Sequence, residues 1–299
     1  MSRTVTVGLD GSRESLAAAE WAAREAVLRD VPLKLVNIWE ADPFIQAPLL
    51  GRETEQHWAE RIPRETADRL QRRHPEVEVV IEQIAGKPGT VLPELNKDSE
   101  VLVLGSRGLS GVAGFMVGSV GMATVAHSVR PVVLVRAGTQ PEDEHAPASD
   151  GKATVETPYR PVVLGLDLRS PDDTVIEYAF DAAARRKAPL VVLHSWNLPP
   201  YFAYGLPPDP ELNARLATGE AEELTKALRP WRQKFPDVEV VERSEPGKAA
   251  DQLVEAARDA SLVVVGRRHR RSGLGAHTGP VTHAVLHHAT APVAVVPHD

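Results

Sequence analysis

The stretch "VLVLGSRGLSGVAGFMVGSVGMATVAH", residues 101–127, decides the fold of this 299-residue chain. It opens with four consecutive apolar residues, Val101 to Leu104, which is typical of a strand buried on both faces. It closes with the run Met122 to His127, which is typical of a short helix. Between positions 105 and 121 there are six glycines. The stretch therefore predicts a strand, a glycine-rich loop and a helix in succession.

The rest of the first half alternates strand-like and helix-like segments in the same way. Such alternation predicts an α/β fold with a parallel sheet and helices on both faces. In open sheets of this kind, the ligand site lies beyond the carboxyl ends of the strands. The expected strands are 5–9, 33–39, 77–84, 101–105 and 131–136, and the expected helices are 13–30, about 54–73, 88–96 and 119–128.

The chain also repeats itself. Asp10 recurs as Asp167 at an offset of 157 residues, within two similar strand ends. Residues 86–105 match residues 247–266 at an offset of 161, so a single four-residue insertion in the second half reconciles the two offsets. This agreement indicates an internal duplication.

We therefore expect two domains joined by a polar, aperiodic segment. The boundaries are residues 1–137 for the first domain, 138–159 for the linker, and 160–299 for the second domain.

Composition narrows the classes of function. A hydrophobic fraction of 42% and a charged fraction of 25% are ordinary for a globular protein. The net charge of −7 argues against nucleic-acid binding, and the absence of cysteine excludes disulfides and thiolate metal sites. No apolar run approaches the roughly 18 residues of a membrane span, and no signal peptide precedes the first strand. We expect a cytoplasmic protein, and the 26 arginines among 34 basic residues fit a GC-rich bacterial genome.

The glycines follow the spacing Gly105-x2-Gly108-x9-Gly118-Ser119. Glycine lets backbone N–H groups converge on an anion, and a helix N-terminus adds unpaired N–H groups and a favourable dipole. The loop is neither a Walker A loop nor a dinucleotide fingerprint, because it lacks the Gly-Lys-[Ser/Thr] ending and the G-x-G-x-x-G spacing. The two interpretations that remain are a phosphate cradle and a flexible loop with a glycine-rich helix start.

Together with "VGLDGS" at 7–12, this spacing resembles the universal stress protein family, over nearly the whole chain as a tandem pair. The resemblance implies two five-stranded parallel sheets of order 3-2-1-4-5, packed as an intramolecular pseudo-dimer. It also implies bound ATP, which Mg²⁺ can accompany, and no catalytic residue. The nucleotide contacts that it implies are Gly8, Leu9, Asp10, Gly11, Ser12, Ile38, Gly105, Ser106, Arg107, Gly108, Gly118, Ser119 and Val120.

Asp10 has two interpretations from its position alone. A carboxylate at a strand end can accept a hydrogen bond from a ribose hydroxyl or an adenine amino group. It can equally form an Asx turn or an N-cap at the start of the helix 13–30. The second aspartate at the corresponding place, Asp167, favours the ligand interpretation.

The second half departs from the pattern, with His269 in place of the middle glycine and Pro280 in place of the serine. Proline suits the first helical position but removes a backbone N–H and a hydroxyl. The segment "RRHRR" (267–271) offers side chains to a phosphate instead, and its alternative interpretation is a solvated basic loop. A weaker second site would comprise Asp167, Ser195, Gly266, Arg268, His269 and Gly279.

These observations predict an ATP-binding regulatory protein of the stress response that is not an enzyme. The alternatives are a ligand-free interaction scaffold and a slow ATP-hydrolysing or adenylating enzyme. His283 and His287 have a spacing that suits a shared metal, but we expect no metal site, because no glutamate follows His283. Expected partners are ATP, an unidentified protein and a second copy of the tandem chain, with no nucleic acid and no membrane.

Overall fold

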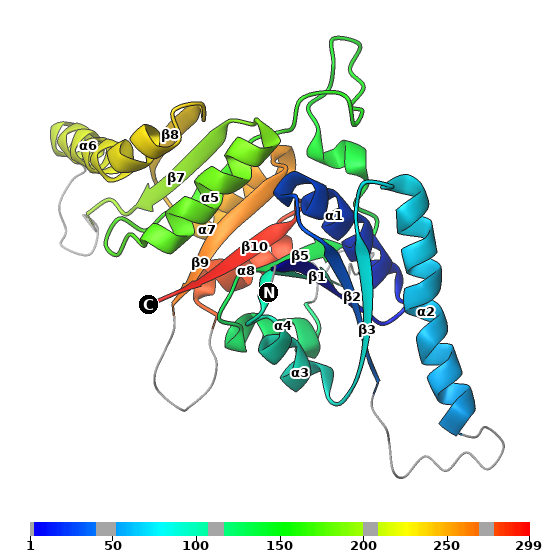
Figure 1. The fold of residues 1–299 in the computed structure, drawn as a ribbon. Coiled ribbons are helices and arrows are strands. Elements are labelled where there is room, and N and C mark those ends of the chain that lie inside the picture. Colours follow the sequence, from blue (N-terminus) through cyan, green and yellow to red (C-terminus); the bar gives the residue numbers. More distant parts are fainter. Residues whose placement is uncertain (1–2, 40–51, 107–116, 200–208, 269–277) are drawn as a thin grey trace. The chain divides into compact units, whose positions relative to one another are not determined.

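A computed structural model describes residues 3–39, 52–106, 117–199, 209–268 and 278–299, with the backbone alone for 52–60 (Figure 1). The chain divides into two compact units. The first is built around Met1–Pro141, and the second comprises Glu142–His269 and Gly279–Asp299.

The first unit contains a five-stranded sheet in which all neighbouring strands are parallel. Its order is β3-β2-β1-β4-β5, as expected from the sequence. The register places Val7 of the central strand beside Leu35 on one side and Val103 on the other. The strands are β1 (Thr4–Leu9), β2 (Leu33–Trp39), β3 (Val79–Ala85), β4 (Ser99–Ser106) and β5 (Val132–Arg136).

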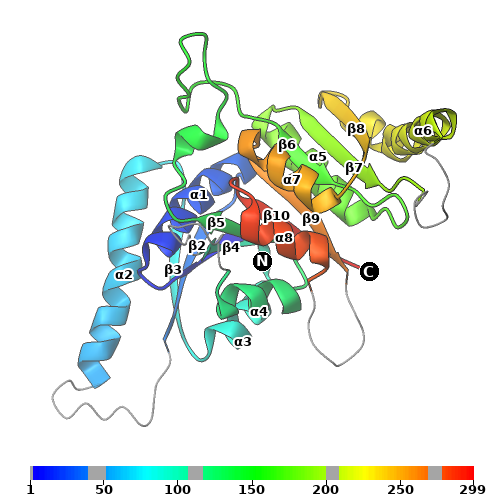
Figure 2. The ribbon, with the colours of Figure 1, turned by 180° about the vertical axis from the view of Figure 1, so that it is seen from behind.

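Four helices cover the two faces of this sheet (Figures 1 and 2). Helix α1 (Arg13–Arg29) packs on β1, β4 and β5, and α2 (Arg52–Arg73) packs on β2, β3 and α1. Helices α3 (Pro88–Leu95) and α4 (Ser119–His127) pack against each other and against the opposite face. Since both faces are covered, these strands are largely buried: Val5, Val7, Leu33 and Leu35 have no exposed surface, and Thr6, which faces the other way from Val5 and Val7, is 1% exposed.

The second unit repeats this topology with the order β8-β7-β6-β9-β10. Its strands, all parallel, are β6 (Val162–Gly165), β7 (Leu190–Trp196), β8 (Val240–Pro246), β9 (Leu262–Arg268) and β10 (Val293–His298). Its helices are α5 (Asp173–Arg186), α6 (Pro210–Lys234), α7 (Ala249–Ala256) and α8 (Pro280–His288), with a short 3-10 turn at η3 (Ala257–Asp259). The duplication inferred from the offsets is thus repeated in the fold.

The segment expected to be an aperiodic linker has structure of its own. It contains the 3-10 turn η1 (Pro141–Glu144), and an isolated antiparallel bridge joins His145 to Tyr159, whose rings lie 4.2 Å apart. Arg160 Nε donates to the carbonyl of His145 at 2.9 Å. Contacts between individual side chains leave no periodic pattern in the sequence. The sequence therefore predicted a linker without structure of its own.

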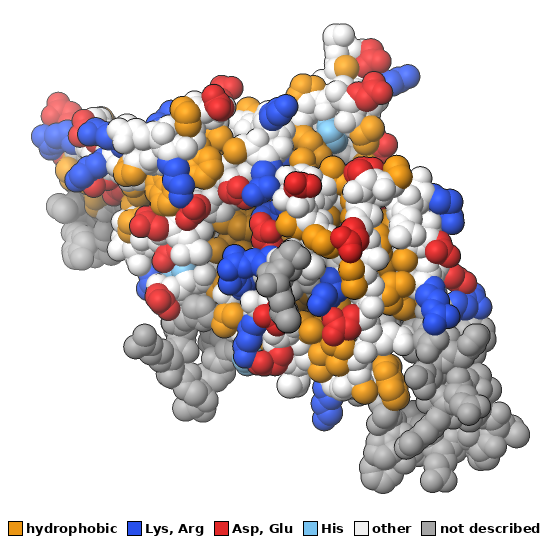
Figure 3. Space-filling model, viewed as in Figure 1, with side chains coloured by type: hydrophobic (Ala, Val, Ile, Leu, Met, Phe, Trp, Pro, Cys, Tyr) orange, Lys and Arg blue, Asp and Glu red, His pale blue; other side chains and the backbone are white. Residues whose placement is uncertain are grey.

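Charged side chains of both signs are interspersed over the visible surface (Figure 3). Within the parts of the chain that the structure describes, no helix is both long enough and apolar enough to cross a membrane. The packing of the two halves as a pseudo-dimer stays a prediction.

Candidate nucleotide-binding site

The candidate site of the first unit lies where the strand order changes direction. From β1 the chain continues into β2 on one side, whereas β4 pairs with β1 on the other side. The carboxyl ends of β1 and β4 are therefore neighbours, and the helices that follow them diverge to opposite faces. This is the position at which open α/β sheets bind ligands.

Asp10 follows β1 directly and is exposed. Its Oδ1 accepts hydrogen bonds from the backbone N–H of Ser12 at 2.9 Å and from the Ser12 hydroxyl at 2.5 Å. The Ser12 oxygen in turn accepts from the Ser15 N–H at 3.2 Å and caps α1. Both of the hydrogen bonds from Ser12 use Oδ1. The structural role of Asp10 is therefore compatible with a second role toward a ligand.

The electrostatics of Asp10 favour its charged form. Burial acts to raise the pKa of this carboxyl, but the hydrogen bonds from Ser12 and Ser15 outweigh burial and lower the pKa below its ordinary value of 3.8. Gly11 makes the tight turn possible, because its φ is +79° and a Cβ there would lie 2.9 Å from Ile62.

Gly105, at the end of β4, is glycine for a packing reason. A Cβ at this position would lie 2.4 Å from the carbonyl carbon of Glu14 and 2.7 Å from the nitrogen of Ser15, both in the first turn of α1. The next predicted contact, Ser106, is buried, and its hydroxyl donates to the carbonyl of Val135 at 3.3 Å. The sequence interpretation that linked Gly105 to the phosphates therefore competes with a purely structural explanation.

Gly118 is different, because a Cβ there would meet no atom of the described residues within 4 Å. It is the N-cap of α4 with φ −63° and ψ 162°, and no side chain caps the helix. Ser119 and Val120 in the first turn are exposed. The first N–H groups of α4 are thus open to an anion, and the helix dipole adds to the attraction.

Gly8, Leu9 and Ile38 complete the described part of the predicted site. Gly8 is tightly packed, since a Cβ would lie 2.8 Å from Leu104. Asn37, beside the half-buried Ile38, donates from Nδ2 to the Leu9 carbonyl at 2.9 Å and so fixes the ends of β1 and β2 together. The remaining predicted contacts, Arg107 and Gly108, lie outside the described residues.

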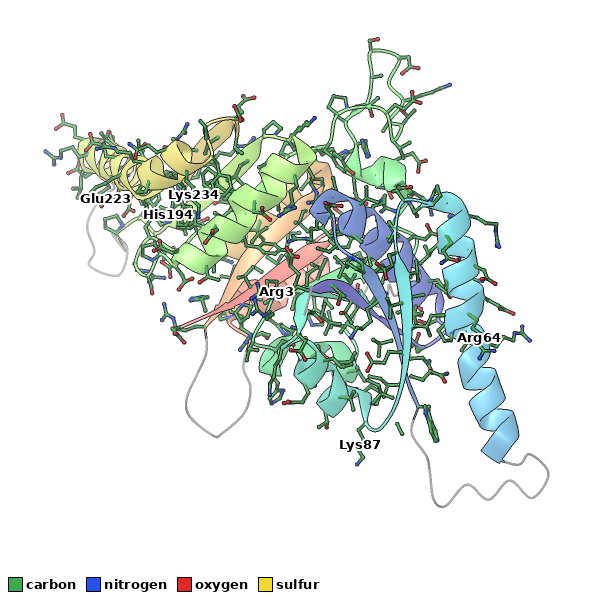
Figure 4. All side chains as sticks on the ribbon, in the orientation of Figure 1. Arg3, Arg64, Lys87, His194, Glu223 and Lys234 are labelled. Carbon is green, nitrogen blue, oxygen red and sulfur yellow. The ribbon has the colours of Figure 1, made fainter. Side chains whose placement is uncertain are left out.

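In the second unit His194 replaces Asn37 in this role (Figure 4). Its Nδ1 lies 3.1 Å from the Leu166 carbonyl, which can only accept, so this nitrogen donates. Its Nε2 lies 3.0 Å from a carboxylate oxygen of Glu220 on α6. The strand end is therefore tied to the outer helix as well as to β6.

Both oxygens of the Asp167 carboxylate accept hydrogen bonds from one cation. Arg169 donates from Nε to Oδ1 at 3.1 Å and from Nη2 to Oδ2 at 3.3 Å. Burial acts to raise the pKa of Asp167, but the hydrogen bonds and charge of Arg169 outweigh it, and the pKa is lowered. Arg169 corresponds to Ser12 at the offset of 157, a signal that the sequence interpretation missed.

The other predicted residues of the second site are also engaged or altered. Ser195 donates its hydroxyl to Gln252 Oε1, and a Cβ at Gly266 would lie 2.8 Å from the His298 ring. Gly279 caps α8 with φ −57° and ψ 160°, nearly the geometry of Gly118, but Pro280 follows it. The second unit therefore keeps the N-terminus of the corresponding helix, α8, but Pro280 removes one of its backbone N–H groups.

The basic segment 267–271, for which the sequence allowed either a phosphate contact or a solvated loop, is described only at Arg267 and Arg268. Arg267 is buried at the end of β9, and desolvation lowers its pKa, whereas Arg268 is exposed. His269 lies outside the described residues. On α8 the rings of His283 and His287 are 4.4 Å apart, and within the described ranges no cluster of three metal-ligating side chains occurs.

Comparison with known proteins gives a consistent result. The profile of the universal stress protein family matches residues 1–136 and 158–297. A universal stress protein of Mycolicibacterium smegmatis is 33% identical over 98% of this chain and 96% of its own length. One from Mycobacterium tuberculosis is 32% identical over 97% of this chain and 96% of its own length.

Among solved structures, a universal stress protein from Archaeoglobus fulgidus superposes with a TM-score of 0.71 at 17% identity. The match covers 100% of both chains and bears on the fold alone. A universal stress protein crystallised in complex with cAMP matches 46% of this chain and 98% of its own, at 28% identity and a TM-score of 0.34.

Proposed function

Because the chain belongs to the universal stress protein family, we propose that it is a stress-response regulator that holds ATP in its first unit. The proposal assigns the nucleoside to Asp10 and to the backbone at Ile38. It assigns the ribose and phosphates to the residues around the α4 N-terminus, namely Gly105, Arg107, Gly108, Gly118, Ser119 and Val120. Mg²⁺ can enter with the phosphates.

One observation supports the proposal above the others. No side chain among the described residues caps the first N–H groups of α4, which lie next to the point where strand order changes. Each hydrogen bond to a charged oxygen contributes about 1.5–3 kcal/mol. Four or five such bonds, less the entropic cost of binding, would hold a triphosphate with a dissociation constant in the micromolar range. This corresponds to a binding free energy on the order of −8 kcal/mol.

The substitution Gly118→Asp tests the proposal directly. The backbone of Gly118 is extended, and a Cβ there would meet no described atom within 4 Å. Because aspartate is also a favoured N-cap, the variant should be at least as stable as the wild type. A carboxylate at this place repels the phosphates, and we expect ATP affinity measured by calorimetry to fall at least about tenfold.

Two matched variants make the result specific. Gly118→Asn adds the same volume without the charge, and it should weaken ATP less than Gly118→Asp. Gly279→Asp places the same charge at the α8 N-terminus, where the backbone geometry is nearly the same, and it should leave the tight site intact. Unchanged ATP affinity in Gly118→Asp would remove the α4 N-terminus from the site.

The alternatives are tested on the wild-type chain. Mass spectrometry of the purified protein identifies a co-purifying nucleotide, and calorimetry with ATP and with cAMP ranks the two ligands. A scaffold without a ligand would bind neither nucleotide. An enzyme would convert ATP to ADP or AMP at many turnovers, whereas we expect turnover to be absent or very slow.

A further inference from the structure

A basic hollow lies in the first unit, on the side of α1 that faces α2. Its volume is about 260 Å³. Three arginines line it: Arg13 at the start of α1, and Arg69 and Arg73 on the last turns of α2. The segment Gly138–Pro141, which follows β5, closes one side. None of the residues lining the hollow belongs to the nucleotide site proposed above.

The only carboxylate in the lining of the hollow, Glu20, is already shared. Its Oε1 accepts from Arg73 Nη1 at 2.9 Å, and its Oε2 lies 3.7 Å from His74 Nε2. Burial acts to raise the pKa of Glu20, but His74, Arg73 and Arg69 outweigh burial and lower the pKa, so this carboxylate is charged. One negative charge against three arginines leaves the hollow positive.

Glu20 does not accept a hydrogen bond from every N–H group of Arg69. Its Nε lies 3.5 Å from Glu20 Oε1 without making a hydrogen bond. Its Nε and Nη2 atoms are both shielded from solvent, and no described residue forms a hydrogen bond with either. These two nitrogens form the side edge of the guanidinium group, which presents two parallel N–H groups to a phosphate or carboxylate. Leaving such donors unpaired is unfavourable, so the geometry suits an anion that accepts from both.

The second unit supplies an internal comparison. There Glu177 on α5 and Lys234 on α6 form an ion pair at 2.6 Å, at the positions that correspond to Glu20 and Arg73. An ion pair between the two helices is therefore common to both units, and holding these helices together is sufficient to account for it. Arg13 and Arg69 correspond instead to Ser170 and Pro230. The additional arginines are thus peculiar to the first unit, and helix pairing does not require them.

We propose that this hollow is a second anion site, which binds the phosphate group of a small phosphorylated molecule. Arg69 rotates its side edge, which is shielded from solvent in this structure, toward the phosphate, and Arg13 and Arg73 supply further charge. The size of the hollow suits a phosphate monoester better than a nucleoside triphosphate, because ligand pockets for drug-sized molecules have volumes of about 300–1,000 Å³.

Inorganic phosphate is the probe for the test. The full chain is titrated with it at constant ionic strength, against chloride, while the backbone amides of Gly138 and Thr139 are followed by NMR. We expect saturable shifts of these amides with a dissociation constant on the order of 1 mM. Arg69→Gln should weaken binding about tenfold, and the exposed Arg13→Gln should weaken it less. Lys234→Gln, at the corresponding place in the second unit, should have no effect.

The outcome is separable from that of the ATP proposal. Gly118→Asp should leave the phosphate response at Gly138 and Thr139 unchanged. Shifts confined to the amides of Ser119 and Val120 would mean that phosphate enters only the α4 site, and would overturn the inference. A linear response without saturation, or equal affinity in wild type, Arg13→Gln and a folded Arg69→Gln, would overturn it as well.

Discussion

Two glycines of the same loop signature have opposite physical reasons to be glycine. Gly105 lies against the backbone of α1, where an added Cβ would be 2.4 Å from Glu14, whereas Gly118 faces open space. A motif therefore does not assign one role to all of its members. Gly105 positions the strand end, and Gly118 leaves a helix terminus open.

This difference predicts opposite effects on stability. Gly105→Ala should lower the free energy of unfolding by about 1–3 kcal/mol, because backbone atoms of α1 cannot move aside as a flexible side chain can. Gly118→Ser should leave it unchanged or raise it slightly, since serine caps helices well. Urea denaturation of both variants without nucleotide measures the contrast. Equal stability in the two variants would contradict the packing explanation.

The carboxylate of Asp10 predicts a pH dependence of stability. Its pKa in the folded chain is lowered below 3.8, so its contribution to stability is present above that value and is lost as pH falls through the lowered pKa. Asp10→Asn removes the charge. The variant should be less stable than the wild type at pH 7, and the difference should shrink toward pH 3. A difference that grows with acid would reverse the sign and contradict the assignment.

At the scale of helices and strands, hydrophobic pattern was sufficient for most of the architecture. Every strand expected in the first half is present, and the family resemblance correctly predicted the strand order. The pattern works because strands covered on both faces must be continuously apolar. It also placed the start of α4 at Ser119, since glycine followed by a helical run marks an N-terminus.

Contacts between individual side chains could not be predicted in this way. The bridge of His145 with Tyr159 and the ion pair of Arg169 with Asp167 depend on turns that hydrophobic periodicity does not describe. The hollow lined by Arg13, Arg69 and Arg73 brings together residues that are far apart in the sequence. Aligning the two halves residue by residue would have indicated Arg169, because it stands where the first half has Ser12.

Arg169 predicts a gain of function in the loop after β6. The pair with Asp167 is exposed, with 89% of the Arg169 side chain accessible, so it competes only weakly with a ligand. Arg169→Ser restores the residue found in the first half and frees the carboxylate. We expect the variant to bind adenosine a few-fold more tightly in the second unit, as measured by NMR shifts near Asp167. Unchanged adenosine binding would show that Asp167 does not contact the nucleoside.

For the whole chain, the duplication has produced two units of one topology with different residues at the candidate ligand sites. Among the described residues, the first has an α4 without a capping side chain and an Asp10 without an ion pair, and the second has Pro280 in α8 and an Asp167 paired with Arg169. The second unit lacks one backbone N–H and one hydroxyl at the phosphate end. At a low value of about 1.5 kcal/mol for each hydrogen bond to a charged group, the deficit is about 3 kcal/mol, or roughly a hundredfold in affinity.

This asymmetry predicts one tight ATP site per chain. Of the basic residues in the second loop, Arg267 is buried at the end of its strand and is poorly placed to recover the loss. Exposed arginines such as Arg268 must be ordered on binding, which has an entropic cost. Equilibrium dialysis should therefore find a stoichiometry near one ATP per chain at micromolar concentration, with a weaker site that prefers ligands with fewer phosphates. Gly118→Asp should abolish the tight site and leave the weak one, because the second helix terminus is untouched. Two equal, tight sites would mean that arginine side chains fully replace a backbone cradle, and that the helix N-terminus contributes little to ATP affinity.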